Sequence, residues 1–568
     1  MATINRRDLI SGLLGAAALR ATGCSTGDSA SQRLQIEGEL FAPDFETGHR
    51  FRLATASPES SEAGRSNWAA DTIGAIEEWR EIPVVIVGGG IAGLCAAWRL
   101  KRSGFEQFQL LELEDHLGGT SRSGEHRGFQ FPWGAHYITT PMPENTQLIA
   151  LLREMGVVED LASDGKPVIA EEYLCREPEE RVFADEHWQE GLFPVAGATQ
   201  DDLDQLASFH KRMLDFSLMR DEHGKRFFAL PIALSSEDPQ ARKFDQISML
   251  QWMEQQGWTS SKLRWYVDYA CRDDYGLTID RTSAWAGILY YASRIQNGSQ
   301  ASQDVITWPS GNGHIVKHLQ ESLKAHLNPG MMVAKIDPKE QSERSRSCEL
   351  IVYDKVQKRF VGYRCDRVIF AAPQFVAKHV IEDFRTDRSI AALDLPFQYG
   401  WWLVANLHLS SRPSDSGFPM SWDNIIYESK SLGYVVATHQ LGVDHGPTVL
   451  TWYYPFADAN PPFTREQLLS VPWSHWVEMV LSDLEVAHRE IRSLVTRVDV
   501  MRWGHAMVQP YTNFLWSETR RMAAMPDRNV HFANTDLSGL ALLEEAVHHG
   551  VRAADEVLES LDKNELAG

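Results

Sequence analysis

The sequence predicts an α/β fold in which a Rossmann-type dinucleotide-binding domain carries a second, inserted domain. The first observation is IPVVIVGGGIAGLCAAWRL, residues 82–100, where a β-branched strand passes through a glycine-rich turn into a helical pattern. The second is FQLLE, a further strand that ends at Glu112, 19 residues after Gly93. The third is the return of strand-rich segments late in a chain of 568 residues, which is too long for one simple core.

The glycine-rich turn has the spacing of a pyrophosphate-binding loop. Gly88 allows the sharp turn, Gly90 lets the backbone approach a pyrophosphate, and Gly93 lets the helix pack closely on the strand. The pyrophosphate then rests on the helix N-terminus, at Ile91 and Ala92. Glu112 follows at the distance where a carboxylate reaches a ribose hydroxyl. Glycines also cluster in ordinary turns, but the order of strand, turn, helix, strand and acid favours a dinucleotide site. This segment alone leaves FAD and NAD open.

The N-terminus has the pattern of an export signal. Arg6 and Arg7 precede an apolar run from Leu9 to Leu19, and small residues lead to Cys24. This resembles a twin-arginine signal, which directs folded proteins across the bacterial inner membrane. We therefore expect an exported, periplasmic protein that meets the export machinery. Cys24 resembles a lipidation site, so membrane anchoring as a lipoprotein is a further expectation; the alternative is an uncleaved, frayed terminus.

Composition excludes several other classes of protein. The net charge of −22 disfavours a nucleic-acid partner, because phosphate binding needs a basic face. No stretch after residue 25 is apolar and long enough to span a bilayer. The six cysteines are scattered without metal-binding spacing, so we expect no zinc site and no disulfide framework. A small-molecule substrate is the partner that remains, and the oligomeric state is open.

Four segments carry a family resemblance. LEDHLGGTSRSG (113–124) places Gly118 and Gly119 after the acid, PWGAHYI (132–138) follows, MMVAKID (331–337) reads as a strand, and NVHFANTDLSG (529–539) lies near the end. In this order they resemble the flavin amine oxidase, phytoene desaturase and protoporphyrinogen oxidase superfamily. The resemblance implies FAD, bound by these residues: Gly88, Gly90, Ile91, Ala92, Gly93, Glu112, Gly118, Gly119, Thr120, Arg122, Gly134, Ala135, His136, Val333, Asp536 and Leu543.

The resemblance also implies a domain plan. A glutathione-reductase-like FAD-binding domain is expected from residues 81–140, 300–380 and 526–561. An α+β substrate domain is expected from 141–299, which reads as mostly helical, and from 381–525. Residues 1–24 are the export signal and 25–80 a tether.

The sequence also departs from the family pattern. Thr120 stands where an arginine often follows the two glycines, with Arg122 as a substitute. Counting from Pro396 puts Trp402 where monoamine oxidases keep a lysine near the flavin, and Leu542 where they keep one cage aromatic. Without a facing carboxylate or an aromatic cage, desolvation of an ammonium is costly. We therefore expect no conventional amine oxidase, and slow or no turnover of simple amines with oxygen.

Few residues stand out as catalytic. His136 and Trp402 are the candidates beside the flavin, and CRDDYG (271–276) is interpreted as a helix-ending turn with a surface ion pair rather than pocket lining. The favoured function is FAD-dependent removal of a hydride from a C–N or C–C bond, with electrons passed to oxygen or a membrane acceptor. The alternatives are a carotenoid- or porphyrin-type desaturase or isomerase acting on an apolar substrate, and a flavin-bearing electron-transfer or partner subunit.

Overall fold

The computed structural model describes residues 36–50, 76–295, 304–338, 348–385, 397–458 and 465–567. Residues 36–568 form one compact unit. The expected export signal, with Arg6, Arg7 and Cys24, lies outside the described residues, as does most of the expected tether. Within the described part of the chain, no helix is long and apolar enough to cross a membrane.

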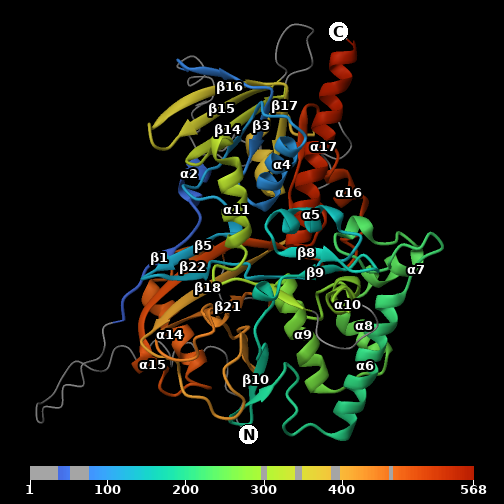
Figure 1. Cartoon of the computed structure of the whole chain (residues 1–568), viewed down its shortest axis with the longest axis vertical. Coiled ribbons are helices and arrows are strands. Elements are labelled where there is room, and N and C mark those ends of the chain that lie inside the picture. Colours follow the sequence, from blue (N-terminus) through green and yellow to red (C-terminus); the bar gives the residue numbers. More distant parts are fainter. Residues whose placement is uncertain are drawn as a thin grey trace, which may run out of the picture. The chain divides into compact units, whose positions relative to one another are not determined.

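A five-stranded parallel sheet forms the centre of the nucleotide-binding half (Figure 1). Its strands come from three distant parts of the sequence. They stand in the order β13 (Leu327–Asn328), β4 (Phe108–Leu111), β3 (Val84–Val87), β17 (Arg367–Phe370) and β23 (Val530–Phe532). The first crossover is α4 (Ile91–Arg102), which is separated from β3 by a turn of three residues. This is the strand–turn–helix unit that the sequence predicts.

Both faces of this sheet are covered. Val84 and Ile86 pack with helices α4, α5 (Thr146–Glu154), α11 (Gly313–Leu323) and α17 (Leu543–Ala567). Val85 and Val87 point to the other face, because side chains alternate along a strand. That face meets a four-stranded sheet of β14 (Met331–Pro338), β15 (Cys348–Asp354), β16 (Arg359–Cys365) and β2 (Trp79–Glu81). A strand buried on both faces reads as an unbroken apolar run, which explains VVIV.

An eight-stranded sheet forms the second half. Its order is β1 (Leu40–Phe41), β22 (Val495–Val508), β18 (Tyr399–Leu409), β21 (Thr448–Pro455), β20 (Tyr434–Val436), β19 (Asp423–Ile426), β10 (Glu180–Ala184) and β11 (His187–Glu190). Along β18, Leu403 and Ala405 face a core that includes α14 (Trp473–Leu484). Trp402 and Val404 face the opposite core, which is shared with Phe131 of the nucleotide-binding half. The core that contains Trp402, Val404 and Phe131 therefore joins the two halves.

A helical group completes the second half, with α6 (Gln200–Leu218), α7 (Pro239–Arg242), α8 (Met249–Gln255), α9 (Ser261–Tyr275) and α10 (Ala284–Ala292). The expectation that residues 141–299 are mostly helical is wrong between α5 and α6. Strands β8 (Val158–Leu161), β9 (Pro167–Ile169), β10 and β11 occupy that region. Short strands such as these gain their stability from partners: β10 pairs with β19, which lies 243 positions later in the chain.

Residues 36–50, within the expected tether, form secondary structure. β1 pairs in parallel with β22, where Leu40 stands opposite Val500, and α2 (Phe45–Arg50) follows. The Asp44 carboxylate lies 2.8 Å from the Lys355 ammonium of the nucleotide-binding half. Residues 36–50 therefore contact both halves of the protein. The strand pairing and the ion pair stabilise these contacts, which a solvated linker would lack.

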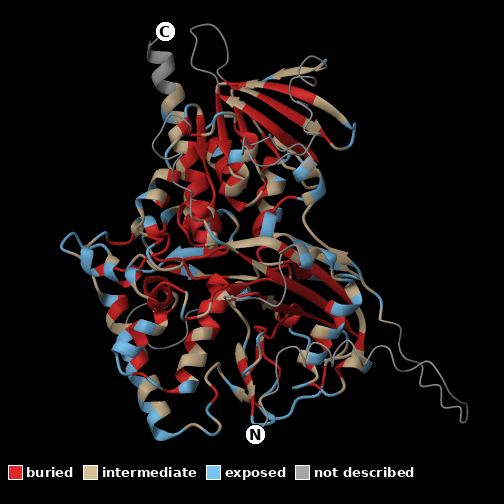
Figure 2. Cartoon of the chain, turned by 180° about the vertical axis from the view of Figure 1, so that it is seen from behind, coloured by how far each residue is buried: buried red, intermediate tan, exposed pale blue. Residues whose placement is uncertain are grey.

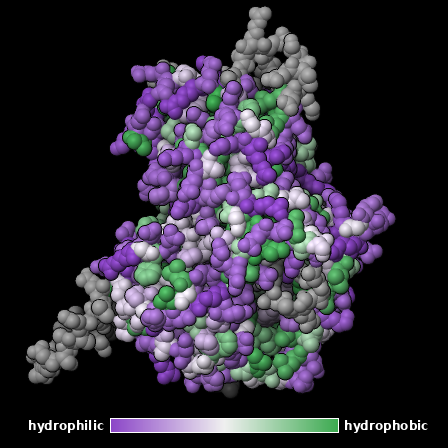
Figure 3. All heavy atoms as spheres, in the orientation of Figure 1, coloured by the Kyte–Doolittle hydropathy of each residue, from purple (hydrophilic) through white to green (hydrophobic). Residues whose placement is uncertain are grey.

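Buried residues fill the sheets and the helix faces that cover them (Figure 2). The face seen in Figure 3 is mainly hydrophilic, with apolar residues in scattered areas. The cysteines of the described residues are free. No group of ligands that could hold a metal ion occurs within the ranges that the structure describes.

Candidate functional site

The predicted nucleotide-binding residues lie together at the ends of the parallel strands. The Gly118 N–H donates to the Gly89 carbonyl at 2.8 Å, which joins the second glycine pair to the first turn. The Ala135 N–H then donates to the Thr120 carbonyl at 3.0 Å. Gly88 and Gly118 have φ of +106° and +109°, values that favour glycine. Three separate sequence motifs thus form one continuous surface.

Glu112 is half-buried directly after β4 and organises the turn. Its carboxylate accepts hydrogen bonds from the Gly89 N–H at 2.5 Å and the Glu114 N–H at 2.8 Å. Burial raises its pKa, although the backbone N–H groups oppose this shift. Each carboxylate oxygen has further acceptor capacity, so Glu112 is able to take a ribose hydroxyl beside the glycine turn.

We expect Glu112→Ala to weaken FAD binding by about 1–3 kcal/mol through loss of a charge-assisted hydrogen bond. The structure adds a cost, because the Gly89 and Glu114 N–H groups also lose their acceptor. The measurement is FAD affinity by fluorescence titration of the apoprotein, with exposed Glu125→Ala as the control. Unchanged affinity would remove Glu112 from the ribose site.

The remaining predicted nucleotide-binding residues approach from other strands. The N–H of Met331, the first residue of β14, donates to the Glu112 carbonyl at 2.7 Å. Val333 follows two residues later on the same strand, so the strand that carries it begins beside Glu112. The Asp536 carboxylate accepts hydrogen bonds from the Gln374 N–H and the Tyr399 hydroxyl, each at 2.7 Å. Burial raises the pKa of Asp536 to about 6. The Arg122 guanidinium lies 3.6 Å from the Glu114 carboxylate.

A large cavity continues from the nucleotide-binding surface into the second half. Its volume is about 1040 Å³, counted together with the space at its mouth that is open to solvent. The predicted residues Thr120, Gly134, Ala135, His136, Trp402 and Leu543 line it, and so does Leu542. Leu543 is the first residue of α17, so this 25-residue helix begins at the cavity wall. The first N–H groups of a helix lack intrahelical partners and favour an electron-rich ligand atom.

The two predicted catalytic candidates are neutral. Burial lowers the pKa of His136 to about 4, and its ring lies 4.8 Å from that of Tyr453. Trp402 stands opposite Trp503 in the sheet, and its side chain is 7% exposed. Neither is suited to general acid–base work near neutral pH. Both are suited to shaping the cavity wall.

Carboxylates also line the cavity, which the sequence analysis did not anticipate. Asp273, Asp274 and Glu544 are lining residues, and the described lining contains one guanidinium, that of Arg294. Arg294 donates to both oxygens of Asp274 at 3.0 and 3.1 Å. The Tyr137 hydroxyl lies 3.4 Å from the Asp273 carboxylate. Burial and the Asp274 carboxylate raise the pKa of Asp273.

The interpretation of CRDDYG as a turn with a surface ion pair is therefore wrong. The helix does end there, with Gly276 as a left-handed cap at φ +59°. However, both aspartates precede the cap and face the cavity, because β7 (Tyr137–Thr139) and Arg294 pack against this end of α9. The statement that the site lacks a facing carboxylate is wrong for the same reason. The adjacent acids Asp273 and Asp274 were the signal in the sequence that could have indicated a carboxylate-lined cavity.

The residues present fit a bound FAD. A Cβ added at Gly90 meets no described atom within 4 Å, whereas a Cβ added at Gly93, three residues later, would lie 1.9 Å from the Gly88 carbonyl oxygen. The Gln374 side chain is 3% exposed, and both its amide atoms lack a partner among the described residues. Open space beside the turn and unpaired buried polar atoms beside Asp536 are what a dinucleotide would fill and satisfy.

Comparisons with known proteins agree with this geometry. A family model described as flavin containing amine oxidoreductase matches residues 91–558. A putative flavin-containing monoamine oxidase from Mycobacterium tuberculosis is 26% identical over 264 residues, 45% of this chain and 51% of that protein. A 1-hydroxycarotenoid 3,4-desaturase from Flavobacterium is 42% identical over 57 residues, 10% of this chain and 12% of that protein. The chain thus spans about half the length of the first relative, and less of the second.

Solved structures share the fold over most of the chain. A triple mutant of putrescine oxidase superposes with a TM-score of 0.61 at 17% identity. The superposition covers 85% of this chain and 100% of that chain. A fatty acid isomerase from P. acnes superposes with a TM-score of 0.56 at 14% identity, covering 84% of this chain and 98% of that one. At such identities the likeness shows the fold alone.

Proposed function

Because the chain belongs to the flavin-containing amine oxidoreductase family, we propose that it is an FAD-dependent enzyme that oxidises the C–N bond of a cationic amine. FAD, the cofactor of this family, supplies the hydride acceptor when bound. Within the broader function expected from the sequence, removal of a hydride from a C–N or C–C bond, this proposal selects the C–N bond. The electron acceptor is oxygen or a membrane component.

One observation supports the choice, namely the excess of carboxylates over cations in the cavity. Asp274 is compensated by Arg294, whereas Asp273 lies beside them with only the Tyr137 hydroxyl as a close partner among the described residues. A buried carboxylate without a cation is costly, and a substrate ammonium would remove that cost. The aromatic rings of Tyr453 and Trp503 in the same lining provide surfaces that favour cations.

The chain's own residues then have distinct roles. Asp273 binds the ammonium, and Arg294 holds Asp274 so that the two carboxylates do not compete for one position. Trp402, Tyr453 and Trp503 enclose the reacting carbon and exclude water. Hydride removal needs the lone pair of the amine nitrogen, so the bound ammonium first gives its N–H proton to the Asp273 carboxylate, whose pKa is raised by burial and by the Asp274 carboxylate. Burial lowers the pKa of His136 to about 4, which makes it too weak a base for this step.

An apolar substrate is the second candidate, and the carotenoid desaturase relative is the reason to keep it. The cavity wall contains apolar side chains such as Leu230, Leu289 and Leu542 that would suit one. A buried carboxylate beside an alkene would lose its hydration without gaining a partner, so the acids disfavour this alternative.

We expect Asp273→Asn to lower the rate of flavin reduction at limiting amine concentration by about 10-fold to 100-fold, because an ammonium–carboxylate hydrogen bond becomes a neutral one. The measurement is anaerobic stopped-flow reduction of the bound flavin by amines. Asp280→Asn on the exposed turn after α9 is the matched control and should behave like the unaltered protein. Equal rates for Asp273→Asn and the control would contradict the assignment of Asp273.

A further inference from the structure

A segment before the nucleotide-binding unit crosses from one half of the protein to the other. Residues 36–50 carry β1, which pairs with β22 in the second half, and α2, which contacts β14 in the nucleotide-binding half (Figure 1). The segment precedes residue 91, where the match to the family model begins, so its role is not inherited from that match. Its contacts have to be interpreted from this chain alone.

The first part of the segment is fixed on β22, a strand that also lines the cavity. The Val498 and Val500 N–H groups donate to the carbonyls of Glu37 and Glu39 at 2.8 and 2.9 Å. Between these two carbonyls, Gly38 has φ +152°, and a Cβ there would overlap the Val498 carbonyl oxygen. Only glycine allows the two backbones to approach this closely. The sequence therefore specifies this attachment.

Phe41 packs against a loop that is predicted to bind FAD. Its ring centroid lies 5.0 Å from that of Trp133, in the core that joins the two halves. Trp133 belongs to the motif PWGAHYI, and its N–H donates to the carbonyl of Arg122, a predicted FAD ligand, at 3.0 Å. Met501, the register partner of Phe41 on β22, places its sulfur 3.5 Å from the Arg122 guanidinium. Phe41 thus packs against two supports of Arg122.

Asp44 connects the segment to the loop that follows β4. The Asp44 N–H donates to the Glu114 carboxylate at 2.6 Å. The Glu114 N–H in turn donates to the carboxylate of Glu112 at 2.8 Å, and the second Glu114 carboxylate oxygen faces the Arg122 guanidinium at 3.6 Å. Glu114 therefore links residues 36–50 to two predicted FAD ligands.

Lys355, directly after β15, holds the same loop and the same segment. Its ammonium lies 2.8 Å from the Asp44 carboxylate and 3.3 Å from the Asp115 carboxylate, and it donates to the Leu113 carbonyl at 3.1 Å. The Lys355 side chain is 18% exposed, so solvent ions screen this pair less than a surface pair. Burial opposes the ionisation of Asp44, but Lys355 and the Thr47 N–H outweigh it and lower the pKa of Asp44.

We propose that residues 36–50 act as a clasp that retains FAD. The clasp fastens the loop of residues 112–122, which carries Glu112 and Arg122, to β22 in the other half. Release of a dinucleotide from this loop requires the loop to open locally, and the cost of opening is set by the contacts that break. The clasp adds an ion pair, a hydrogen bond and an aromatic contact to that cost. This inference concerns the cofactor and does not depend on which bond the enzyme oxidises.

The test measures the rate of FAD release from the loaded protein, by the recovery of flavin fluorescence after dilution. The double variant Phe41→Ala, Asp44→Asn should release FAD at least about tenfold faster, because it loses the ring contact and the ion pair with Lys355. Asparagine keeps an oxygen that can accept from the Thr47 N–H, so the start of α2 is preserved. Glu46→Ala, an exposed acid on α2, is the matched control and should release FAD at the unaltered rate.

A second measurement separates retention of FAD from general stability. Bound FAD raises the thermal midpoint by an amount that depends on its affinity, and the double variant should show a smaller increase than the unaltered protein. An unaltered release rate in the double variant would overturn the proposal, whatever the stability of that variant. A thermal midpoint that falls equally with and without FAD would overturn it too, because the segment would then stabilise the fold without favouring the bound state.

Discussion

A Gly90→Val protein is expected to be isolated colourless, without FAD. The backbone at Gly90 has φ −71° and ψ 179°, values that any residue adopts, and an added Cβ meets no described atom within 4 Å. The apoprotein should therefore fold normally. With FAD present, the side chain would occupy the space where the pyrophosphate approaches the backbone, so binding is lost rather than weakened.

The measurement is the ratio of visible to ultraviolet absorbance of the purified protein, with circular dichroism to confirm folding. Gly504→Val is the matched control, since its Cβ would make only ordinary contacts at 3.7 Å with Arg465. Full flavin content in Gly90→Val would remove the glycine turn from the cofactor site. Loss of flavin in the control as well would mean that the effect is not local.

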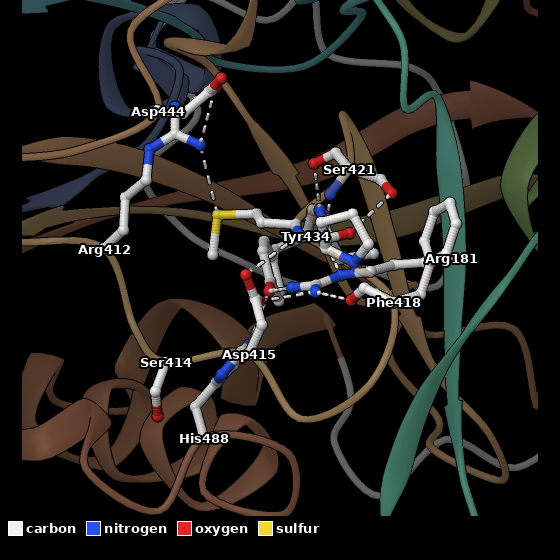
Figure 4. A network of polar contacts seen from close by, with 12 residues as sticks. Arg181, Arg412, Ser414, Asp415, Phe418, Ser421, Tyr434, Asp444 and His488 are labelled. Atoms are coloured by element: carbon white, nitrogen blue, oxygen red, sulfur yellow. Dashed lines mark hydrogen bonds and ion pairs between the residues drawn. The ribbon is translucent and has the colours of Figure 1, made fainter.

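Arg181→Met is expected to lower the free energy of unfolding by about 3 kcal/mol, because it breaks the ion pair between the buried Arg181 guanidinium and Asp415 (Figure 4). This value is the lower end of the range for buried ion pairs, since Asp415 is 34% exposed and keeps some hydration. The loss comes from leaving Asn424 and Tyr434 without their charged partner in a buried position. The guanidinium also covers the Trp188 ring at 3.9 Å, a contact that methionine replaces only in part. The measurement is urea denaturation followed by fluorescence.

Arg153→Met on α5 is the control for Arg181→Met. Arg153 is exposed, so its replacement should change stability by no more than about 0.5 kcal/mol. Unaltered stability would show that the network on this face of the sheet does not hold the strand.

The nucleotide-binding half was predictable because its signals are local. The turn from Gly88 to Gly93 follows from one strand and one helix, and Glu112 follows from the next strand along the chain. The separate segments around Val333 and Asp536 were found by resemblance. Val333 lies on β14 of the four-stranded sheet, and Asp536 follows β23, an edge strand of the parallel sheet. In each of these segments the backbone itself approaches the cofactor or a neighbouring strand. Only certain residue types allow such an approach, and this restriction produces a recognisable sequence pattern.

The substrate half was less predictable because its site arises from distant pairings. Tyr453 and Trp503 line the cavity from β21 and β22, which pair with β18 across a long stretch of sequence, and nothing local marks either ring as a cavity residue. Asp273 and Asp274 were visible as neighbours, but their direction depends on the packing of Tyr137 and Arg294. Trp402 was placed in the cavity by counting alone, and the structure has it in the cavity wall.

The most direct test of the account is the visible absorbance of the flavin when putrescine is added to the FAD-loaded protein without oxygen. We predict that the band bleaches fully and that readmitted acceptor restores it. A flavin that keeps its colour with every amine and bleaches with an apolar alkene would contradict the account in favour of C–C chemistry. A flavin that no small molecule bleaches would instead indicate a partner subunit.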